Sequence, residues 1–254
     1  MKARQFLLSH VKAYDAQKAM RISLIIPAYN ESPRLGSTLE AVKAFCADKP
    51  WDAEIIVVDN ASTDGTGGVG HMYGVTVVDE PIRGKGAAVR TGMRVATGDV
   101  KAFLDADHST SIDHLTPMLE RLEQGADVVI GSLALPGARI LVGGHEPWWR
   151  VVSGKIGNLF IQALAVPGIW DTQRGFKVFS RQAADAIFPK LHITGWGFDV
   201  EVLAIARALG YRIDEVPVVW KNHPATKVTS RAYFDVLRDV CKIGWWRITR
   251  AWNL

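Results

Sequence analysis

Runs of branched apolar residues alternate with helically spaced segments through the first half of the chain. The runs are at residues 22–27, 53–59, 74–80, 99–105 and 126–132. The first two are nearly continuous in Ile, Leu and Val, which is typical of strands buried on both faces of a parallel sheet. Helical spacing occupies residues 34–47, 86–97 and 112–124. The order βαβαβ predicts an α/β fold with a mostly parallel central sheet flanked by helices, and ligands at the carboxyl ends of the strands.

The second half of the chain has a different pattern. Residues 136–170 are rich in Gly, Trp and aliphatic side chains, and they lack the strand rhythm of the first half, so we expect an amphipathic helix with flanking loops. The C-terminal stretch 236–254 combines Trp245, Trp246 and Trp252 with several cations, the composition of a helix that lies in a lipid headgroup interface. Packing of this helix on the sheet is the alternative.

Composition narrows the class of protein. The chain of 254 residues has 48% hydrophobic and 22% charged residues, which suits one globular domain. Thirty Lys and Arg against 26 Asp and Glu give a net charge of +4, which suits phosphate-bearing partners or anionic surfaces without requiring nucleic acid. Cys46 and Cys241 lie outside any C-x-x-C motif, which argues against a disulfide framework or structural zinc. No secretory signal and no transmembrane helix are predicted, so we expect a cytoplasmic protein.

The fourth apolar run ends in two aspartates, Asp105 and Asp107, separated by one small residue. Because side chains alternate along an extended backbone, both carboxylates lie on the same side and can face one divalent cation and the phosphates that it carries. The same pattern also occurs in turns and at solvated strand ends. Its interpretation therefore depends on the neighbouring loops.

Three further loops are expected at the same edge of the sheet. The segments 27–31 and 57–66, which read PAYNE and VVDNASTDGT, offer carboxylate and amide groups where a nucleoside could lie. RGKG then opens a helix after two glycines, so that backbone N–H groups and the cations Arg83 and Lys85 can approach a phosphate. Four strand-end loops thus converge on one site.

Other chemistry-bearing residues carry weaker signals. The glycines at 65–70 match G-x-G-x-x-G, but they begin six residues after Asp59 and no acid follows about 20 residues later, so we expect a flexible surface loop and not a dinucleotide site. Arg174 and Lys177 are either site residues or solvated loop charges. His108 and His223 are isolated, and we assign neither a role.

The ordered motifs PAYNE, VVDNASTDGT, RGKG and DAD resemble the family 2 glycosyltransferases of the GT-A fold. Two later segments, DTQRGFKVFSRQAA at 171–184 and GWGFDVEVLAIARALGY at 195–211, are similar to the dolichyl-phosphate sugar synthases, in which a nucleotide sugar donates its hexose to a polyprenyl phosphate. The DTQ-x-GFK form is more similar to the glucose-transferring branch, which favours UDP-glucose over GDP-mannose. The resemblance implies an N-terminal extension at 1–20, a GT-A domain at 21–228 and a C-terminal amphipathic helix at 229–254.

The resemblance also implies roles for the donor-binding residues. It places Pro27, Tyr29, Glu31 and Asp59 around the base and ribose, with Asp64 shaping the loop and Lys227 neutralising the diphosphate. Asp105 and Asp107 would hold the nucleotide and a Mg²⁺ or Mn²⁺ ion. The mannose-transferring relatives often carry a glutamine where this chain has Ser109, which leaves metal coordination at that position open.

The acceptor chemistry follows from charge. A divalent cation stabilises the departing nucleotide diphosphate as a Lewis acid, and a phosphate acceptor is already anionic, so it needs no strong general base. Arg139, Arg150 and Ser153 flank the segment where a lipid phosphate would enter, and Arg150-x-x-Ser153 resembles a phosphate-contacting pattern of the family. Asp199 would position the acceptor or the sugar. In-line displacement predicts inversion at the anomeric carbon.

Alternatives remain open from the sequence. A family 2 enzyme that acts on a sugar hydroxyl would use Asp199 as its base, and a degenerate site would make the chain a nucleotide-binding scaffold. Asp199 and Glu201 could instead cap the helix that follows, and for Glu201 we expect this simpler role. For a lipid acceptor we expect peripheral attachment to the cytoplasmic face of a membrane, with a separate membrane protein as a further partner.

Overall fold

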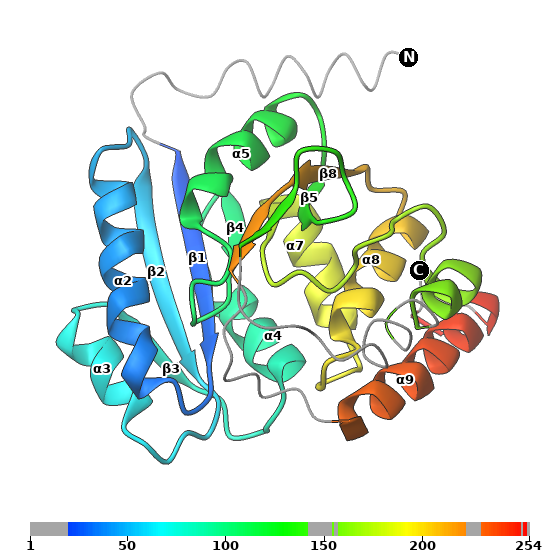
Figure 1. Ribbon diagram of the computed structural model, residues 1–254, viewed down its shortest axis with the longest axis horizontal. Helices are drawn as coiled ribbons and strands as arrows, with labels where there is room; N and C mark the ends of the chain where they lie inside the picture. Colours follow the sequence, from blue (N-terminus) through cyan, green and yellow to red (C-terminus); the bar gives the residue numbers. More distant parts are fainter. Residues whose placement is uncertain (1–19, 142–153, 155–156, 222–229, 250, 253–254) are drawn as a thin grey trace.

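A seven-stranded sheet forms the centre of the molecule (Figure 1). The computed structural model describes residues 20–141, 154, 157–221, 230–249 and 251–252. The strands are β1 (Arg21–Ala28), β2 (Asp52–Asp59), β3 (Thr76–Asp79), β4 (Val100–Phe103), β5 (Val128–Ser132), β7 (Lys177–Ser180) and β8 (Ile213–Pro217). They lie in the order β3-β2-β1-β4-β7-β5-β8, and every neighbouring pair is parallel except the two that involve β7. The mostly parallel sheet that the apolar runs predict is confirmed.

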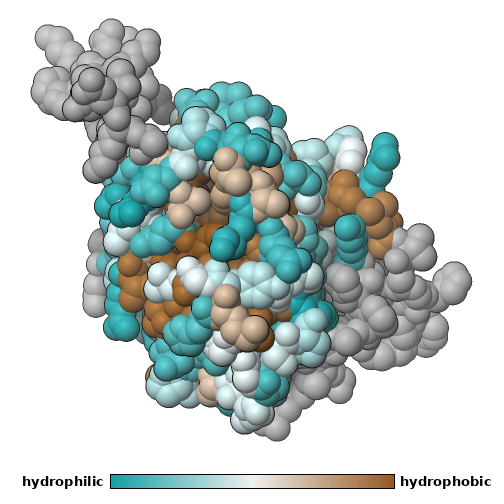
Figure 2. Space-filling model, turned by 90° about the vertical axis from the view of Figure 1, so that its left-hand side faces the viewer, coloured by the Kyte–Doolittle hydropathy of each residue, from teal (hydrophilic) through white to brown (hydrophobic). Residues whose placement is uncertain are grey.

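Helices cover both faces of this sheet. They are α2 (Ser32–Ala47), α3 (Thr66–Met72), α4 (Lys85–Val95), η1 (Ile112–His114), α5 (Leu115–Glu123), η2 (Ile161–Ala165), α7 (Arg181–Ile187), η3 (Phe188–Lys190), α8 (Phe198–Ala208) and α9 (Ser230–Thr249). One apolar core joins the sheet to α2 and α5, and the other joins it to α4, α7, α8 and α9. The side of α2 and α3 faces the viewer in Figure 2, where hydrophilic residues surround a central apolar area.

The continuous apolar run of β1 is explained by these two cores. Leu24 and Ile26 belong to the core under α2, whereas Ile25 between them belongs to the core under α4, and all three are fully buried. Since successive side chains of a strand point to opposite faces, a strand covered on both sides needs an apolar residue at every position. The predicted strands and the three predicted helices of the first half are therefore confirmed.

The glycine-rich segment is a helix, α3, so the prediction of a flexible surface loop at 65–70 was wrong. A Cβ atom on Gly70 would lie 2.7 Å from Cγ2 of Val77, and one on Gly67 would lie 2.7 Å from Oδ2 of Asp59. These glycines allow the helix to lie directly against β2 and β3. Their role is close packing.

The later part of the chain differs from the single amphipathic helix expected at 136–170. It contains the strand β6 (Arg139–Leu141), which pairs with β9 (Val219–Lys221) in a separate two-stranded parallel sheet, and a helical segment over 157–160 that continues into η2. Residues 142–153 lie outside the described part of the chain, and so do 222–229. Among the described helices none is long and apolar enough to cross a membrane.

The C-terminal helix α9 packs on the domain through one face. It contacts α8 and η2, and its Val240 and Ile243, together with Trp252 beyond the helix, are buried in the core. Its opposite face leaves Trp245 65% exposed. Packing of this helix on the domain, the alternative from the sequence, is therefore confirmed, and its position in a lipid interface stays a prediction.

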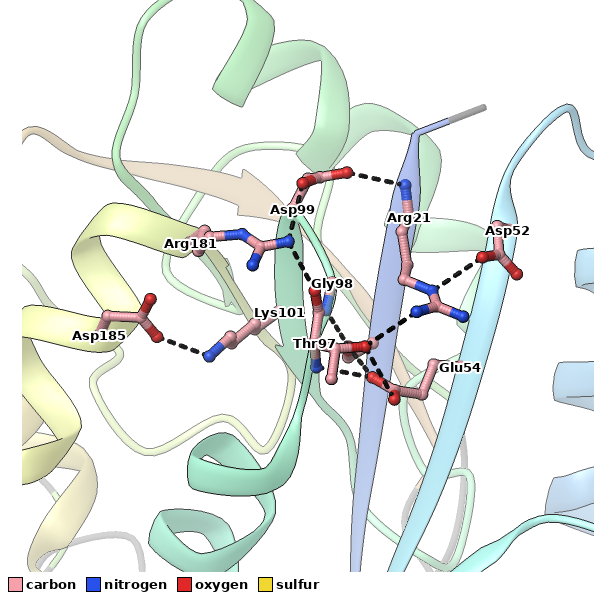
Figure 3. A network of polar contacts seen from close by, with 10 residues as sticks. Arg21, Asp52, Glu54, Thr97, Gly98, Asp99, Lys101, Arg181 and Asp185 are labelled. Atoms are coloured by element: carbon pink, nitrogen blue, oxygen red, sulfur yellow. Dashed lines mark hydrogen bonds and ion pairs between the residues drawn. The ribbon is translucent and has the colours of Figure 1, made fainter. Parts of the chain in front are cut away.

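A polar network closes the amino-terminal ends of β1, β2 and β4, at the edge of the sheet opposite to the strand-end loops (Figure 3). Arg21 donates to Asp52 at 2.7 Å, and Lys101 pairs with Asp185 at 2.6 Å. Glu54 accepts from the Thr97 backbone N–H at 2.9 Å. These contacts hold the beginnings of the strands together. The predicted functional groups lie at the opposite, carboxyl ends.

Candidate active site

Loops at the carboxyl ends of β1 and β2 and the turn before α4 are tied together by side-chain hydrogen bonds. The Asn30 backbone N–H donates to Ser62 Oγ at 3.0 Å, and the Glu31 N–H donates to Thr66 Oγ1 at 2.8 Å. The Gly84 N–H donates to Asn60 Oδ1 at 2.7 Å. The predicted convergence of these loops on one edge of the sheet is therefore present.

The first loop contributes an aromatic ring and an acid. Tyr29 follows the end of β1, and the Arg83 guanidinium carbon lies 4.0 Å from the centre of its ring, a cation–π distance. Glu31 is mostly buried and pairs with Arg34 at 2.7 Å. Pro27 lies within β1, paired in register with Val58 of β2. The structure thus brings Tyr29 and Arg83 together, whereas Pro27 lies within the sheet and its contact with the donor stays a prediction.

Asp59 and Asp64 both bind backbone groups of their own region. Asp59 accepts from the N–H of Ser62 at 3.0 Å and from that of Gly67 at 3.1 Å. Asp64 accepts from the Ser32 N–H and the Thr66 hydroxyl. Burial disfavours the charged Asp64, but these hydrogen bonds outweigh it and lower its pKa to about 2. Both aspartates therefore fix the shape of the loop, as expected for Asp64.

The turn before α4 requires glycine and presents Lys85. Gly84 has a φ of 143°, and a Cβ atom there would lie 2.2 Å from the Thr194 carbonyl oxygen. Lys85 Nζ lies 2.6 Å from Asp105 Oδ1, with only 13% of the lysine side chain exposed. Burial alone would lower the pKa of Lys85, but Asp105 and the neighbouring carboxylates outweigh it and raise the pKa, so the cation is retained.

Asp105 and Asp107 lie beyond β4, which ends at Phe103, and Asp107 is in a turn, so the extended backbone expected for the pair was wrong. The two carboxylates have different surroundings. Asp105 is held by Lys85 and packs so closely against Gly175 that a Cβ there would lie 1.8 Å from Asp105 Oδ2. Although burial opposes it, Lys85 lowers the pKa of Asp105. Asp107 Oδ1 accepts from the Ser109 N–H at 3.0 Å, and its Oδ2 lies 4.0 Å from Arg34. Asp107 is therefore the carboxylate less committed to protein cations.

The two carboxylates suit a divalent cation that takes only a few of its ligands from the protein. Carboxylate oxygens are the hard ligands that Mg²⁺ and Mn²⁺ prefer. Within the described ranges no group of three or more His, Cys, Asp or Glu side chains is placed to hold a metal. Asp107 and Asp105 would thus share the ion with phosphate oxygens and water, as Mg²⁺ sites in nucleotide-binding proteins commonly do.

A buried ion pair lies next to this site. Lys177 Nζ is 2.5 Å from Asp199 Oδ1, and the two side chains are 0% and 3% exposed. Lys177 also donates to the Arg174 carbonyl at 2.6 Å. Burial lowers the pKa of Lys177, opposed by Asp199. The alternative of a solvated loop charge is therefore wrong for Lys177.

Arg174 was considered as a solvated loop charge and Glu201 as a helix cap, and the structure shows other contacts for both. Arg174 pairs with Asp171 at 3.0 Å and lies over the Trp220 ring at 4.9 Å, so it is a packed residue. Glu201 accepts from the N–H groups of His192 and Ile193, which lie outside its own helix. The expectation that Glu201 caps α8 was therefore wrong.

The expected acceptor residues are only partly described. Arg139 opens β6, where its side chain is exposed. Arg150 and Ser153 lie outside the described residues, and so does Lys227, which is expected at the donor diphosphate. Their proximity to Asp199 or to the carboxylate pair stays a prediction.

The chain is similar in sequence to one family of known proteins. Residues 23–188 match the family described as Glycosyl transferase family 2. Relatives from Trichomonas vaginalis, Dictyostelium discoideum and Homo sapiens, each named dolichyl-phosphate beta-glucosyltransferase, are 31%, 32% and 30% identical. Each of these matches covers 92% of this chain and 76% to 78% of the relative.

Solved structures share the fold at low sequence identity. Glucosyl-3-phosphoglycerate synthase from Mycobacterium tuberculosis, in complex with Mn²⁺, uridine diphosphate and glucosyl-3-phosphoglycerate, has a TM-score of 0.70 and 20% identity. That match covers 90% of this chain and 80% of the other. Mannosyl-3-phosphoglycerate synthase from Rubrobacter xylanophilus has a TM-score of 0.66 and 21% identity, over 92% of this chain and 76% of the other.

Proposed function

Because the chain belongs to glycosyl transferase family 2, and is a glycosyltransferase with the GT-A fold, we propose that it transfers glucose from UDP-glucose to the phosphate of dolichol or another polyprenol. The names of its relatives support this acceptor class and a glucosyl product. GDP-mannose is the second donor to consider. An in-line attack by the acceptor phosphate oxygen would invert the anomeric carbon.

The observation that supports a phosphate acceptor is the burial of Asp199 and its contact with Lys177. A hydroxyl acceptor needs a general base that can reach its proton. Asp199 is 2% exposed and its carboxylate is engaged by Lys177 at 2.5 Å, so it is poorly placed for that task. A phosphate acceptor carries its nucleophilic oxygen already deprotonated near neutral pH. The geometry therefore favours a phosphate over a sugar hydroxyl.

In the proposed mechanism the chain's own groups bind and orient the diphosphate. Asp107, with Asp105, would hold Mg²⁺ or Mn²⁺, which supplies Lewis-acid stabilisation of the leaving group. Asp105 fixes the ammonium group of Lys85 at 2.6 Å, and Arg83 lies against Tyr29 beside it. Both cations would face the phosphates, where positive charge stabilises the charge that develops on departure.

The acceptor phosphate would be held by cations on the other side of the sugar. We place Arg139, Arg150 and Ser153 there, with Lys227 near the diphosphate, on the pattern of the sequence. Asp199, paired with Lys177, would position the acceptor or the sugar, because the pair is buried beside the carboxylates of the donor site. Guanidinium groups suit this task since they bind phosphate in a bidentate manner.

The exposed face of α9 would lie on the membrane. Phe234, Trp245 and Ile248 are 74%, 65% and 79% exposed, and the cations Arg238 and Lys242 are exposed on the same helix. Apolar and cationic side chains on one exposed helix suit an anionic lipid interface. Peripheral attachment would keep the lipid tail in the bilayer while its phosphate reaches the sugar, on the cytoplasmic face and with a membrane protein as a further partner.

A transfer assay tests the proposal. The full chain is incubated with radiolabelled UDP-glucose or GDP-mannose, Mn²⁺ and a polyprenyl phosphate in detergent. We expect label from UDP-glucose in the organic phase, and its loss in Asp107→Asn but not in Asp113→Asn, an exposed acid of η1 that serves as the matched control. Label in the organic phase from neither donor would refute the proposal.

A further inference from the structure

Glu201 of α8 gathers contacts from distant parts of the chain although it lies outside the candidate site. Its side chain is fully buried. It accepts from the backbone N–H of His192 at 3.0 Å and from that of Ile193 at 2.8 Å. It also accepts from the indole N–H of Trp252, 51 positions further along the chain, at 3.2 Å. A buried carboxylate with three N–H donors is a strong and geometrically restrictive anchor.

The loop that Glu201 binds, residues 191–197, lies against the turn that presents Lys85. The Ala87 N–H donates to the Thr194 carbonyl at 3.2 Å. A Cβ on Gly84 would lie 2.2 Å from the same carbonyl oxygen, and one on Gly86 would lie 2.5 Å from the Ile193 carbonyl oxygen. Lys85 Nζ is 5.8 Å from the centre of the Trp196 ring. The backbones of loop and turn are therefore in contact, and a shift of one requires a shift of the other.

The C-terminal region packs on the opposite side of this loop. A Cβ on Gly197 would lie 2.7 Å from Cβ of Asp239 in α9. The Trp246 ring is 5.1 Å from the His192 ring and 6.2 Å from the Trp252 ring. Figure 1 shows α9 beside α8, from which Glu201 reaches the loop. Loop 191–197 is thus held between the C-terminal region and the Gly84–Lys85 turn.

We propose that Glu201 is a positioning residue of the donor site: it joins Trp252, in the C-terminal region, to loop 191–197, and so holds the Gly84–Lys85 turn in the conformation that binds a nucleoside diphosphate. This inference rests on the proposed function. It makes donor binding dependent on Trp252, which is far from the carboxylate pair in sequence. By linkage, a bound diphosphate must in turn stabilise the contacts of Glu201.

Binding of UDP with Mn²⁺ to the full chain, measured by calorimetry without any lipid, tests the inference. Glu201→Gln places an amide N–H₂ group where a hydrogen-bond acceptor is needed, and we expect the affinity of this variant for UDP to fall by about tenfold. Trp252→Phe removes the indole N–H together with the pyrrole ring and keeps a smaller aromatic side chain, and we expect a loss of about threefold in affinity for UDP. Trp245→Phe is the matched control, because Trp245 lies in the neighbouring helix α9 with its side chain 65% exposed, and the affinity of this variant for UDP should equal that of the wild type.

Two further measurements separate positioning from simple loss of stability. In transfer assays the KM for the donor should rise in both variants, while kcat at saturating donor stays within about twofold. In the wild type, saturating UDP should slow hydrogen exchange at the amides of His192 and Ile193, and Glu201→Gln should abolish that protection.

The outcomes distinguish the inference from the proposed function. If the wild type binds UDP and both variants bind it equally well, with only their thermal midpoints lowered, Glu201 is merely structural and the inference is wrong. If the wild type binds neither UDP nor GDP, the proposed function fails and the inference fails with it.

Discussion

The ion pair of Lys177 and Asp199 allows stability and acceptor chemistry to be tested by one substitution. Asp199→Asn removes a charge from a pair whose side chains are 0% and 3% exposed, and it leaves the lysine cation buried beside a neutral amide. Loss of one partner of a buried pair typically costs about 3–5 kcal/mol. The Asn oxygen and the Arg174 carbonyl, 2.6 Å from Nζ, can still accept from Lys177, so we expect the lower end, about 3 kcal/mol.

Urea unfolding measures this cost. The double variant Lys177→Gln with Asp199→Asn has no charge at these two positions and can keep a hydrogen bond between them, so most of the lost free energy of unfolding should return. Asp113→Asn, an exposed acid, should unfold at the wild-type midpoint. An Asp199→Asn variant as stable as the wild type would contradict the reasoning about buried charge.

The same variant separates the two acceptor classes. With polyprenyl phosphate as acceptor and at a temperature where the variant is folded, we expect turnover to fall by less than about tenfold, because the acceptor needs no base. If Asp199 were the general base for a hydroxyl acceptor, the loss would be about 10²–10⁴-fold. A loss of that size in a folded variant that still binds UDP would refute the phosphate-acceptor mechanism.

Three further predictions follow from the described contacts. Gly175→Ala should displace Asp105, since the new Cβ would lie 1.8 Å from a carboxylate oxygen, and it should reduce transfer at least about tenfold. Gly68→Ala, whose Cβ would have no atom within 4 Å, should leave transfer unchanged, and equal activities of the two variants would contradict the packing argument. Asp64 has a pKa of about 2 against an ordinary 3.8, so its contribution to stability is present above pH 3.8 and is lost as the pH falls toward 2. The stability of Asp64→Asn should therefore depend less steeply on pH in that window, and an unchanged profile would argue against the hydrogen bonds from Ser32 and Thr66 as the cause. The double variant Trp245→Ser with Ile248→Ser should reduce sedimentation with anionic vesicles, while Met72→Ser, which alters an 84% exposed side chain on α3, should not; equal sedimentation would exclude α9 as the docking face.

Local sequence pattern was sufficient for the strands and helices of the first half. An apolar run such as that of β1 predicts a doubly covered strand because each of its residues must meet one of two cores. The pattern was insufficient for α3, since its glycines are explained by close packing against Val77 and Asp59 and not by a turn in the local sequence. The antiparallel strand β7 was also beyond prediction, because strand direction depends on the path of the intervening chain.

The candidate site divides in the same way. Short motifs predict Asp105, Asp107 and the Gly84–Lys85 turn as site residues, although not the turn in which Asp107 lies. For Lys177 the sequence left a site residue and a solvated charge open. Glu201 was misjudged, since an acid in a first helical turn is usually a capping residue. A signal for Lys177 existed in its position at the start of an apolar strand, but its partner Asp199 lies 22 positions away.

The sequence by itself determined the α/β class, the convergence of four strand-end loops and the family resemblance, because each depends on residues close together in the chain. The tertiary structure decided how the charges are shared: Lys85 holds Asp105, Lys177 holds Asp199, and Glu201 holds a loop and Trp252. A buried charge must find a partner wherever the fold brings one within reach, and that distance is a property of the folded chain alone.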